Sequence, residues 1–493
     1  RMSAAPVSGA SPDLVNDDLL PTSAAQRTWD WKAIAALWVG MVVCVPAYML
    51  AAGLVSEGMS WREAVFTIFL ANLIVLAPML LVGHAGAKHG IPFPVLLRAS
   101  FGTQGAKLPA LLRGLVACGW FGIQTWVGGA AIYTIVNVLS GNGIVGERLP
   151  LLGIDLGQAL CFLAFWLLHV VFIRYGTESI RWLELWAAPL LIVMCLALLG
   201  WAHARAEGFG PMLSAPSKFA PGGERAGQFA SVFWPSLTAM VGFWATLALN
   251  IPDFTRFARS QRDQVLGQVL GLPVPMALLA FIGVAVTSAT VLIYGEAIWD
   301  PVALTGRMGG YGVVVALVAL LLATLTTNLA ANVVAPANGF SNLAPQRISF
   351  RMGGYITAGI GIAIFPWKLL ETTGAYIYTW LIGYSALLGP IAGIMLADYY
   401  FIRRTELDRE ALFRHDGAYA YRGGWNPAAL VALVLGVAPN LPGFLKAAGF
   451  VAAVPPAFET IYTYAWFVGL AVAGVVYLLL MSLGNPGTRS ARA

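Results

Sequence analysis

One stretch of the sequence places a side-chain amide next to a large aromatic ring. Trp120 and Gln124 are four residues apart within an apolar run, so on a helix they share one face. The Gln amide offers one acceptor and two donors, which suits the edge of a cyclic imide or ureide, and the Trp ring offers a flat face for stacking. The alternative is a Gln that bonds to a neighbouring helix and a Trp that packs against lipid. These residues alone leave both interpretations open.

A second stretch, residues 323–332, is unusually rich in hydroxyl and amide groups for an apolar segment and ends in Asn332. The Thr326 and Thr327 hydroxyls, together with the Ala323 carbonyl, could supply hard oxygen ligands to a small cation. The alternative is that the Thr hydroxyls bond back to carbonyls of the preceding helical turn.

The remaining reactive residue types predict neither a metal centre nor covalent catalysis. The four cysteines fall in apolar stretches without a CxxC pair, which favours buried, reduced thiols, and the five histidines show no metal-ligand spacing. A membrane-embedded enzyme would need a nucleophile–base pair, a metal set or paired carboxylates, and the apolar stretches of the sequence contain none. We therefore expect no cofactor and no enzymatic activity.

The composition indicates what kind of element must hold these residues. Of 493 residues, 59% are hydrophobic and only 11% are charged, whereas soluble globular chains carry roughly 25% charge. Such a chain lacks the polar surface needed to stay in water, which indicates an all-α integral membrane protein of the cell (plasma or inner) membrane. The net charge of +6 comes without a block of Lys and Arg, so nucleic-acid binding is not expected.

Charge-free stretches predict how often the chain crosses the bilayer. A helix needs about 20 apolar residues to span the hydrocarbon core, and twelve stretches of at least 16 residues contain no Asp, Glu, Lys or Arg. They are 33–56, 64–87, 114–146, 156–173, 185–204, 226–252, 264–295, 308–346, 352–367, 372–397, 423–445 and 460–488. We therefore predict twelve transmembrane helices.

The charges between these stretches predict the orientation. With both termini on one side, that side carries 21 of the 29 Lys and Arg residues and the opposite side carries 8. Cytoplasmic loops are enriched in Lys and Arg. Both termini are therefore expected in the cytoplasm.

Two predicted helices contain interruptions. The first has Pro46 in mid-membrane, where it removes a backbone donor, and the sixth has Gly242-Phe243-Trp244 near its middle. These helices are equivalent if the chain consists of two five-helix halves plus two further helices. Interrupted helices in equivalent positions point to a transporter site at the bilayer midplane, although Gly and Pro are also common in ordinary membrane helices.

Ionisable residues are absent from the centres of the first, third, sixth, eighth and tenth predicted helices. A charged ligand in hydrocarbon would demand a partner charge. We therefore expect a neutral, flat and hydrogen-bonding ligand. Asp253, Asp398 and Glu184 at helix ends leave a proton relay open.

Several motifs together carry a resemblance to a known family. They are Trp120-Phe-Gly-Ile-Gln124-Thr-Trp126, the polar stretch ending in Asn332, Leu249-Asn250-Ile-Pro-Asp253-Phe-Thr-Arg256 and Ala397-Asp398-Tyr-Tyr-Phe-Ile-Arg403-Arg404. From about residue 28 to 482 the chain resembles the nucleobase–cation symporters, which include hydantoin, allantoin and uracil transporters. The resemblance implies a LeuT-type fold, in which two inverted five-helix repeats precede two accessory helices.

This fold divides the chain into six expected segments. They are a cytoplasmic tail (1–31), a first repeat (32–204), an extracellular loop (205–225), a second repeat (226–398), a cytoplasmic loop with two accessory helices (399–482) and a C-terminal tail (483–493).

The resemblance also implies a substrate site. Trp120 and Trp244 would sandwich a heterocyclic ring, while Gln124 and Asn332 would bond to its polar edge. Phe243 stands where the hydantoin transporter has a glycine, which affects the size of the pocket and the choice of substrate.

For the coupling ion, the resemblance implies a Na⁺ site with ligands from two helices. Carbonyls of Gly40 and Val43 would come from the broken first helix, and Ala323, Thr326 and Thr327 would complete the site from the eighth. Thr326 replaces a family serine and keeps the hydroxyl. Cys44 replaces a glutamine near the site, a departure that bears on selectivity.

These observations predict a secondary-active symporter. It would import a neutral nucleobase or related heterocycle of the allantoin, uracil or hydantoin type, coupled to Na⁺ by alternating access. The first alternative is the same kind of carrier driven by H⁺ and specific for another purine or pyrimidine, and the second is a channel. The expected partners are the heterocycle, the ion and the lipid bilayer, and we expect a monomer.

Overall fold

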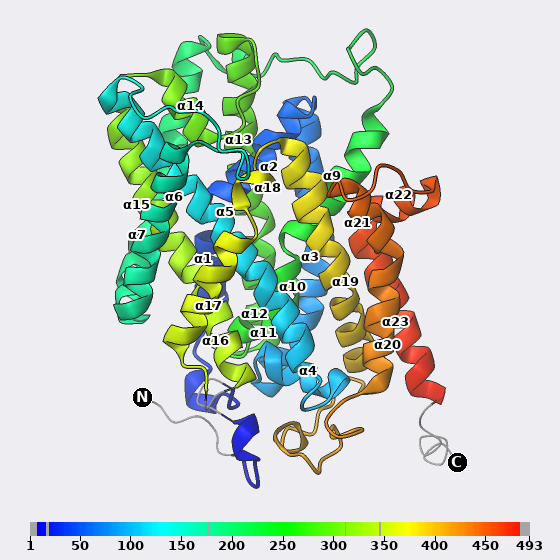
Figure 1. Cartoon of the computed structure of the whole chain (residues 1–493). Coiled ribbons are helices and arrows are strands. Elements are labelled where there is room, and N and C mark those ends of the chain that lie inside the picture. The colour runs from blue at the N-terminus through cyan, green and yellow to red at the C-terminus, as the bar shows by residue number, and fades with distance from the viewer. Residues whose placement is uncertain (1–6, 16–18, 176, 311, 345–346, 484–493) are drawn as a thin grey trace.

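The structure, a computed structural model, describes residues 7–15, 19–175, 177–310, 312–344 and 347–483. Within these residues every regular element is helical, and the only strand-like pairings are isolated bridges. The prediction of an all-α protein is therefore confirmed. Figure 1 shows the helices gathered into one elongated bundle.

The α-helices are α1 (Trp31–Val42), α2 (Val45–Ser56), α3 (Trp61–His89), α4 (Phe93–Phe101), α5 (Lys107–Ser140), α6 (Leu156–Tyr175), α7 (Thr177–Arg205), α8 (Phe209–Met212), α9 (Phe229–Phe243), α10 (Ala245–Asn250), α11 (Pro252–Thr255), α12 (Gln261–Gly271), α13 (Pro273–Tyr294), α14 (Pro301–Met308), α15 (Gly312–Asn332), α16 (Val334–Leu343), α17 (Phe350–Ala363), α18 (Pro366–Leu369), α19 (Ile382–Leu396), α20 (Pro427–Val437), α21 (Leu441–Ala447), α22 (Pro456–Thr463) and α23 (Ala465–Leu483). Two π-helical segments, Ala375–Leu381 and Ala397–Ile402, extend α19 at its two ends.

Eight helical segments in the described part of the chain are long and apolar enough to cross a membrane. They are Trp61–His89, Lys107–Ser140, Leu156–Tyr175, Gln261–Tyr294, Gly312–Ala337, Ala375–Ile402, Pro427–Ala447 and Ala465–Leu483. The bent pair α1–α2 makes a ninth, and Pro189–Arg205 and Phe229–Phe243 are shorter apolar helices. The chain is therefore a multi-pass membrane protein.

The first spanning segment is bent by 60° between α1 and α2. Cys44 has extended backbone angles and precedes Val45 and Pro46, which open α2. Proline has no backbone N–H and fits the first turn of a helix but not its interior. The helix therefore ends at Val42 and restarts three residues later.

The helix of residues 229–250 is interrupted at Trp244, between α9 and α10. The backbone N–H of Trp244 donates to the Val241 carbonyl at 3.2 Å, a tighter turn than that of an α-helix. Both halves pack against α3. The interruption places Phe243 and Trp244 in the middle of the bundle, where both are buried.

The helix contacts place α5 and α15 at the centre. These two helices pack against each other, α6 packs on α5, and α7 packs on α15. The two halves of the bent segment pack elsewhere, α1 on α12 and α2 on α13. On one flank, α20 and α23 pack against α19, and Figure 1 shows them in orange and red at one side of the bundle.

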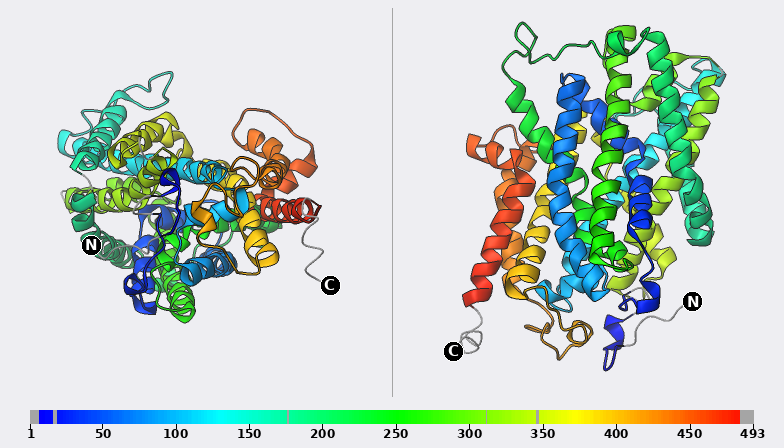
Figure 2. Two further views of the ribbon diagram at one scale, coloured as in Figure 1. Left: turned by 90° about the horizontal axis from the view of Figure 1, so that it is seen from below. Right: turned by 180° about the vertical axis from the view of Figure 1, so that it is seen from behind.

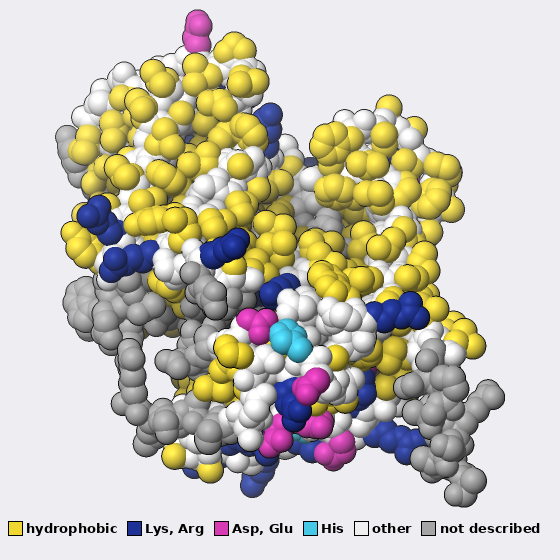
Figure 3. Space-filling model, turned by 60° about the horizontal axis from the view of Figure 1, so that its bottom comes forward, with side chains coloured by type: hydrophobic (Ala, Val, Ile, Leu, Met, Phe, Trp, Pro, Cys, Tyr) yellow, Lys and Arg dark blue, Asp and Glu magenta, His cyan; other side chains and the backbone are white. Residues whose placement is uncertain are grey.

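Both ends of the described chain lie at the same end of the bundle, which we call the terminal end (Figure 2). Figure 3 shows charged side chains gathered at this end and an apolar surface beyond it. The N-terminal segment packs here, because the Thr22 hydroxyl donates to the Arg256 carbonyl at 2.8 Å and Arg27 donates to the Ala87 carbonyl at 3.0 Å.

Candidate functional site

A cavity of about 580 Å³ lies inside the bundle, a size typical of small-molecule sites. Side chains of α1, α5, α10 and α15, with those of the two helix interruptions, form its inner part. Its walls continue past Pro92 and Phe93 at α4 to Asp253 and Arg256, so it extends toward the terminal end. The sequence-predicted residues on its wall are Gly40, Trp120, Gln124, Phe243, Trp244, Thr326, Thr327 and Asn332.

One face of α5 forms a continuous stripe along this cavity. Ala110, Arg113, Ala117, Trp120 and Gln124 all line it and follow each other at intervals of three or four residues. That spacing places side chains on one face of a helix. The predicted shared face of Trp120 and Gln124 is therefore directed into the cavity.

The two predicted amides are bonded differently. Gln124 is 5% exposed and lines the cavity, and none of the described residues hydrogen-bonds to its amide. Asn332 also lines the cavity, but its Nδ2 donates to Oδ1 of Asn328 at 2.9 Å. The Gln124 amide therefore faces the cavity with its acceptor and donors available to a hydrogen-bonding ligand.

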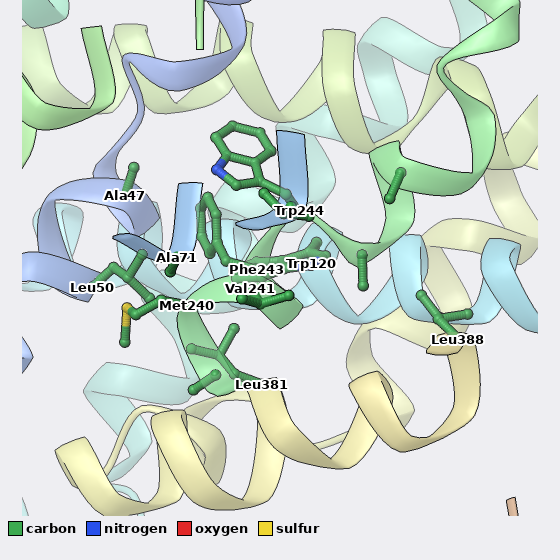
Figure 4. Close-up of a cluster of buried hydrophobic side chains, with 14 of the residues drawn as sticks. Ala47, Leu50, Ala71, Trp120, Met240, Val241, Phe243, Trp244, Leu381 and Leu388 are labelled. Carbon is green, nitrogen blue, oxygen red and sulfur yellow. The ribbon is translucent and has the colours of Figure 1, made fainter. Parts of the chain in front are cut away.

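Trp120, Phe243 and Trp244 line the inner part of the cavity, and Figure 4 shows them within a cluster of buried hydrophobic side chains. Phe243 meets Trp120 edge to face at a centroid distance of 5.3 Å and meets Trp244 in the same way at 4.9 Å. Phe243 thus contacts both of the rings that the resemblance assigns to a sandwich. A ligand between the two Trp rings shares that space with Phe243.

Trp244 is fixed by neighbours that the sequence did not single out. Its indole N–H donates to Oδ1 of Asn72 on α3 at 2.9 Å, and the Asn72 amide donates to the Ile68 carbonyl at 2.8 Å. Trp38 of α1 packs edge-on against the same ring at 5.4 Å. The position of Trp244 therefore depends on helices α1 and α3 as well as on its own interruption.

Beyond Trp120, aromatic rings close the cavity on the side away from the terminal end. We call Trp120, Phe243, Tyr376, Trp380 and Tyr384 the aromatic cluster, and all but the half-buried Trp380 are buried. Trp120 contacts the rings of Trp380, Tyr384 and Tyr376 at 5.6, 6.1 and 6.3 Å. Tyr376 and Trp380 belong to the first part of the segment Ala375–Ile402, whose other end leads to a loop at the terminal end.

The five residues of the predicted cation site lie at two places in the structure. On the α1–α2 side, Cys44 N–H donates to the Val42 carbonyl at 2.9 Å, so the Gly40 carbonyl loses its helical donor. Gly40 lines the cavity, whereas Val43 lies in the α1–α2 break outside the cavity wall.

On α15, Thr326 and Thr327 line the cavity, whereas Ala323 lies outside its wall. The Thr326 hydroxyl donates to the Ala323 carbonyl at 2.8 Å, which is the back-bonding alternative for this residue. These two candidate ligands are therefore bonded to each other in this conformation.

Three buried polar residues behind Asn332 belong to the site although the sequence did not assign them a role. Asn328 donates to Oγ1 of Thr125 and contacts Nε2 of His169, both at 3.1 Å. The signal for His169 was its position within a charge-free stretch, where an imidazole needs hydrogen-bond partners. Its partner on the cavity side, Asn328, lies 159 positions away, so spacing could not identify it.

An ionisable residue also faces the cavity, two turns from Trp120. Arg113 is 8% exposed and lines the wall, and its Nε has no hydrogen-bond partner among the described residues. Asp253 lies on the same wall, where its carboxylate accepts from the Phe93 N–H at 2.7 Å and from Asn250 at 3.2 Å. The inner part of the cavity is neutral, and its charged groups lie toward the terminal end.

Comparisons with known proteins place this geometry in a family. Residues 21–469 match the family of permeases for cytosine/purines, uracil, thiamine and allantoin. The chain is 48% identical over 474 residues to the purine-uracil permease NCS1 of Arabidopsis thaliana. This alignment covers 96% of this chain and 78% of the relative. It is 39% identical over 481 residues to the allantoin permease of Bacillus subtilis, and this alignment covers 96% of this chain and 94% of the relative.

A solved structure of Mhp1 in an inward-facing conformation is similar to the whole bundle, with a TM-score of 0.77. The two sequences are 25% identical, and the match covers 97% of this chain and 95% of that chain. Mhp1 has the LeuT-type fold that the sequence motifs predict for this chain. Because sequence and fold agree over nearly the full length, the chain belongs to the nucleobase–cation symporter family of purine, uracil, allantoin and hydantoin permeases.

Proposed function

We propose that this protein is a secondary-active symporter that imports a neutral nucleobase or related heterocycle of the uracil, allantoin or hydantoin type. The observation that carries this proposal is the unpartnered Gln124 amide in a cavity whose inner end is aromatic. The amide can donate to and accept from a cyclic ureide edge, while Trp120 and Trp244 supply faces for the ring. The purine-uracil and allantoin permeases among its relatives support the same substrate class.

We infer a substrate without charge because the inner part of the cavity is lined by uncharged groups. The walls around Gln124 and Asn332 contribute amide, hydroxyl and aromatic groups, and the charged Arg113 and Asp253 lie closer to the terminal end. A charged ring at the inner end would lack a partner charge.

We propose Na⁺ as the coupling ion, bound between the α1–α2 interruption and α15. The Gly40 carbonyl is without its helical donor, and Thr326 and Thr327 place hydroxyls on the same cavity. Na⁺ binding would require the Thr326 hydroxyl to turn away from the Ala323 carbonyl. The Val43 and Ala323 carbonyls would complete the site once the two helices approach each other.

Transport would proceed by alternating access within a twelve-helix bundle. The contacts of α1 and α2 with α12 and α13 correspond to those of α9 and α10 with α3, and the contact of α5 with α6 corresponds to that of α16 with α17. In each comparison, a helix of residues 32–204 takes the place of a helix of residues 226–398 and the reverse. This correspondence of contacts supports two equivalent five-helix repeats. The cavity extends to the terminal end and the aromatic cluster closes the other, so we assign this conformation as inward-open with both termini in the cytoplasm.

Uptake into proteoliposomes tests the function directly. We expect saturable uptake of radiolabelled uracil, allantoin or hydantoin that depends on an inward Na⁺ gradient. Gln124→Ala and Asn332→Ala should each weaken the apparent affinity about tenfold, because each leaves a polar group of the ring without its partner. Asn440→Ala, which removes a buried amide outside the cavity wall, is the matched control.

Three outcomes would contradict the proposal. Unchanged affinity in both Gln124→Ala and Asn332→Ala would refute the site assignment. Uptake that ignores Na⁺ but collapses with a protonophore would replace Na⁺ by H⁺, and flux without saturation would indicate a channel.

A further inference from the structure

A buried histidine on α6 has its hydrogen-bonding state set by the helix that carries it. His169 is fully buried, and its Nδ1 lies 2.8 Å from the Phe165 carbonyl of the preceding turn. A carbonyl only accepts, so Nδ1 must carry the hydrogen. In the neutral ring, Nε2 is then a bare acceptor. Phe121 and Phe165 pack edge-on against the imidazole at centroid distances of 5.2 and 4.6 Å and hold it in place.

Nε2 of His169 is one of three acceptors that together determine which way the Asn328 amide faces. Three atoms lie 3.1 Å from the Asn328 Nδ2, namely the Phe121 carbonyl, Oγ1 of Thr125 and Nε2 of His169. The Thr125 hydroxyl donates its hydrogen to the Phe121 carbonyl at 2.7 Å. Its oxygen can therefore only accept from Asn328. All three atoms around the nitrogen are therefore acceptors, and the flipped amide would place oxygen against acceptors.

This arrangement is passed on to the cavity wall. With its nitrogen directed at His169, Asn328 presents Oδ1 to Nδ2 of Asn332 at 2.9 Å. Asn332, which lines the cavity, must therefore use one N–H for this bond, and none of the described residues donates to its Oδ1, so that oxygen can accept from a ligand. A histidine on α6 thus contributes, through Asn328, to the orientation of a wall residue on α15.

We propose that His169 is a positioning residue that fixes the Asn332 amide so that the site presents an acceptor to a ring N–H. The inference rests on the proposed function and narrows its substrate class to heterocycles with a free N–H at the edge that faces α15. Gln124 has no described partner and can rotate, so it adapts to the opposite edge of the ring. Asn332 therefore selects a ring with an N–H donor at its edge, whereas Gln124 can bind either a donor or an acceptor on the ring.

Binding of purified protein to uracil and to its two mono-N-methylated derivatives tests this division of roles. We expect the wild type to prefer uracil over the derivative whose methyl group faces Asn332. In His169→Phe, which fills the same space without an acceptor, the affinity for uracil should fall about tenfold while the affinity for that derivative stays unchanged. A merely structural role of His169 would weaken both ligands equally.

His169→Gln supplies the rescue, because its side-chain oxygen can accept from Asn328 and should restore the preference. Should His169→Phe fail to fold, Asn328→Leu removes the same link within α15 and should show the same selective loss. Asn440→Ala, a buried amide outside this network, should leave the preference unchanged.

The two proposals fail in distinguishable ways. A wild type that binds none of uracil, allantoin and hydantoin overturns the proposed function and this inference with it. A wild type that binds uracil, with a preference that His169→Phe leaves intact, overturns the role of His169 and leaves the proposed function standing.

Discussion

Phe243 lines the cavity at the interruption between α9 and α10. It occupies the space between Trp120 and Trp244 and meets both rings edge to face. The ring of a phenylalanine fills space that a glycine leaves open. This favours a small, unsubstituted heterocycle over one that carries a large ring substituent.

Phe243→Gly should therefore enlarge the pocket and change its preference. We expect affinity for hydantoins with a bulky aromatic substituent to rise and affinity for uracil to fall about tenfold, because the unsubstituted ring loses the contact with Phe243. Competition of each ligand against radiolabelled substrate measures both changes. Phe233→Ala, in the same helix α9 but outside the cavity wall, is the control. A uniform loss of affinity for all ligands would show that Phe243 supports the fold only.

Some of the site residues could be predicted from spacing and others could not. Trp120 and Gln124 were identifiable because both lie on one helix, where an interval of four residues fixes a shared face. Asn72 and His169 bond to residues 172 and 159 positions away, and no local pattern encodes that proximity. Arg113 was passed over because it ends a charge-free stretch, although the helix continues through it and places it on the cavity wall.

Glycines set how closely α5 approaches the segment that carries the aromatic cluster. A methyl group at Gly119 would overlap the ring of Trp380, and Trp380 in turn contacts Trp120. The lack of a side chain at Gly119 thus permits the aromatic cluster to close in this conformation.

Gly119→Ala should shift the protein away from the conformation with the closed aromatic cluster, which we propose to be inward-open. Overpacking of this kind costs about 1–3 kcal/mol, and the cost falls on the closed cluster alone. Cys44 lines the cavity, so its labelling by an impermeant maleimide in inside-out vesicles reports the open population. We expect labelling to slow several-fold. Gly359→Ala on α17, where an added methyl meets open space, should leave the rate unchanged, and an unchanged rate in Gly119→Ala would refute the coupling.

The short helix α4 joins separate parts of the terminal end through one arginine. Arg98 is buried and donates to the Leu412 carbonyl at 3.1 Å and to the Leu14 carbonyl at 2.9 Å. Burial lowers the pKa of Arg98 to about 10, so the guanidinium remains charged at neutral pH. One side chain therefore connects the N-terminal segment with the loop before α20.

Arg98→Met should loosen this end of the molecule while leaving the cavity intact. Each hydrogen bond to a charged donor contributes about 1.5–3 kcal/mol to stability. The variant loses both of these bonds and leaves the Leu412 and Leu14 carbonyls without their donor. We expect a lower melting temperature and faster proteolysis within residues 7–30, measured on purified protein. Arg404→Met, on the same end, is the control. Unchanged stability in Arg98→Met would show that water replaces both bonds.

At the level of elements, charge predicted more of the fold than hydropathy did. Each of the twelve charge-free stretches contains helix in the structure, including residues 352–367, where α17 is only 14 residues long. The interruption before Pro46 follows from proline chemistry. The interruption at Trp244 lacks a proline at the break, follows Gly242, and has both of its halves packed against α3. The packing of the N-terminal segment depends on single side chains such as Thr22 and could not be predicted.

Considered as a whole, the molecule is closed at one end of its cavity and open toward the other. The aromatic cluster lies between the cavity and one end, while Leu19, Pro92 and Arg256 line the path toward the terminal end. Transport by alternating access requires a second conformation with these conditions reversed. A substrate that binds both conformations equally would not shift their balance, so in the proposed symport the coupling ion would favour the conformation that receives substrate.

Labelling of a cysteine introduced at Ala117 tests the sidedness of the cavity. Ala117 lines the cavity between Arg113 and Trp120, and Cys44→Ser removes the native cysteine on the same wall. In that background, Ala117→Cys should react with an impermeant maleimide faster in inside-out than in right-side-out vesicles, because the path to it starts at the terminal end. Saturating uracil with Na⁺ should slow the reaction, since a bound ring excludes the reagent.

Ser214→Cys gives the matched control for membrane sidedness. Ser214 is exposed in the loop before α9, which Figure 1 shows at the end opposite the termini. It should react from the outside whatever the state of the cavity. If Ala117→Cys instead reacted mainly from the side of Ser214, the assignment of an inward-open cavity with cytoplasmic termini would be wrong. Protection by substrate on that side would then place the resting protein in its outward-open conformation.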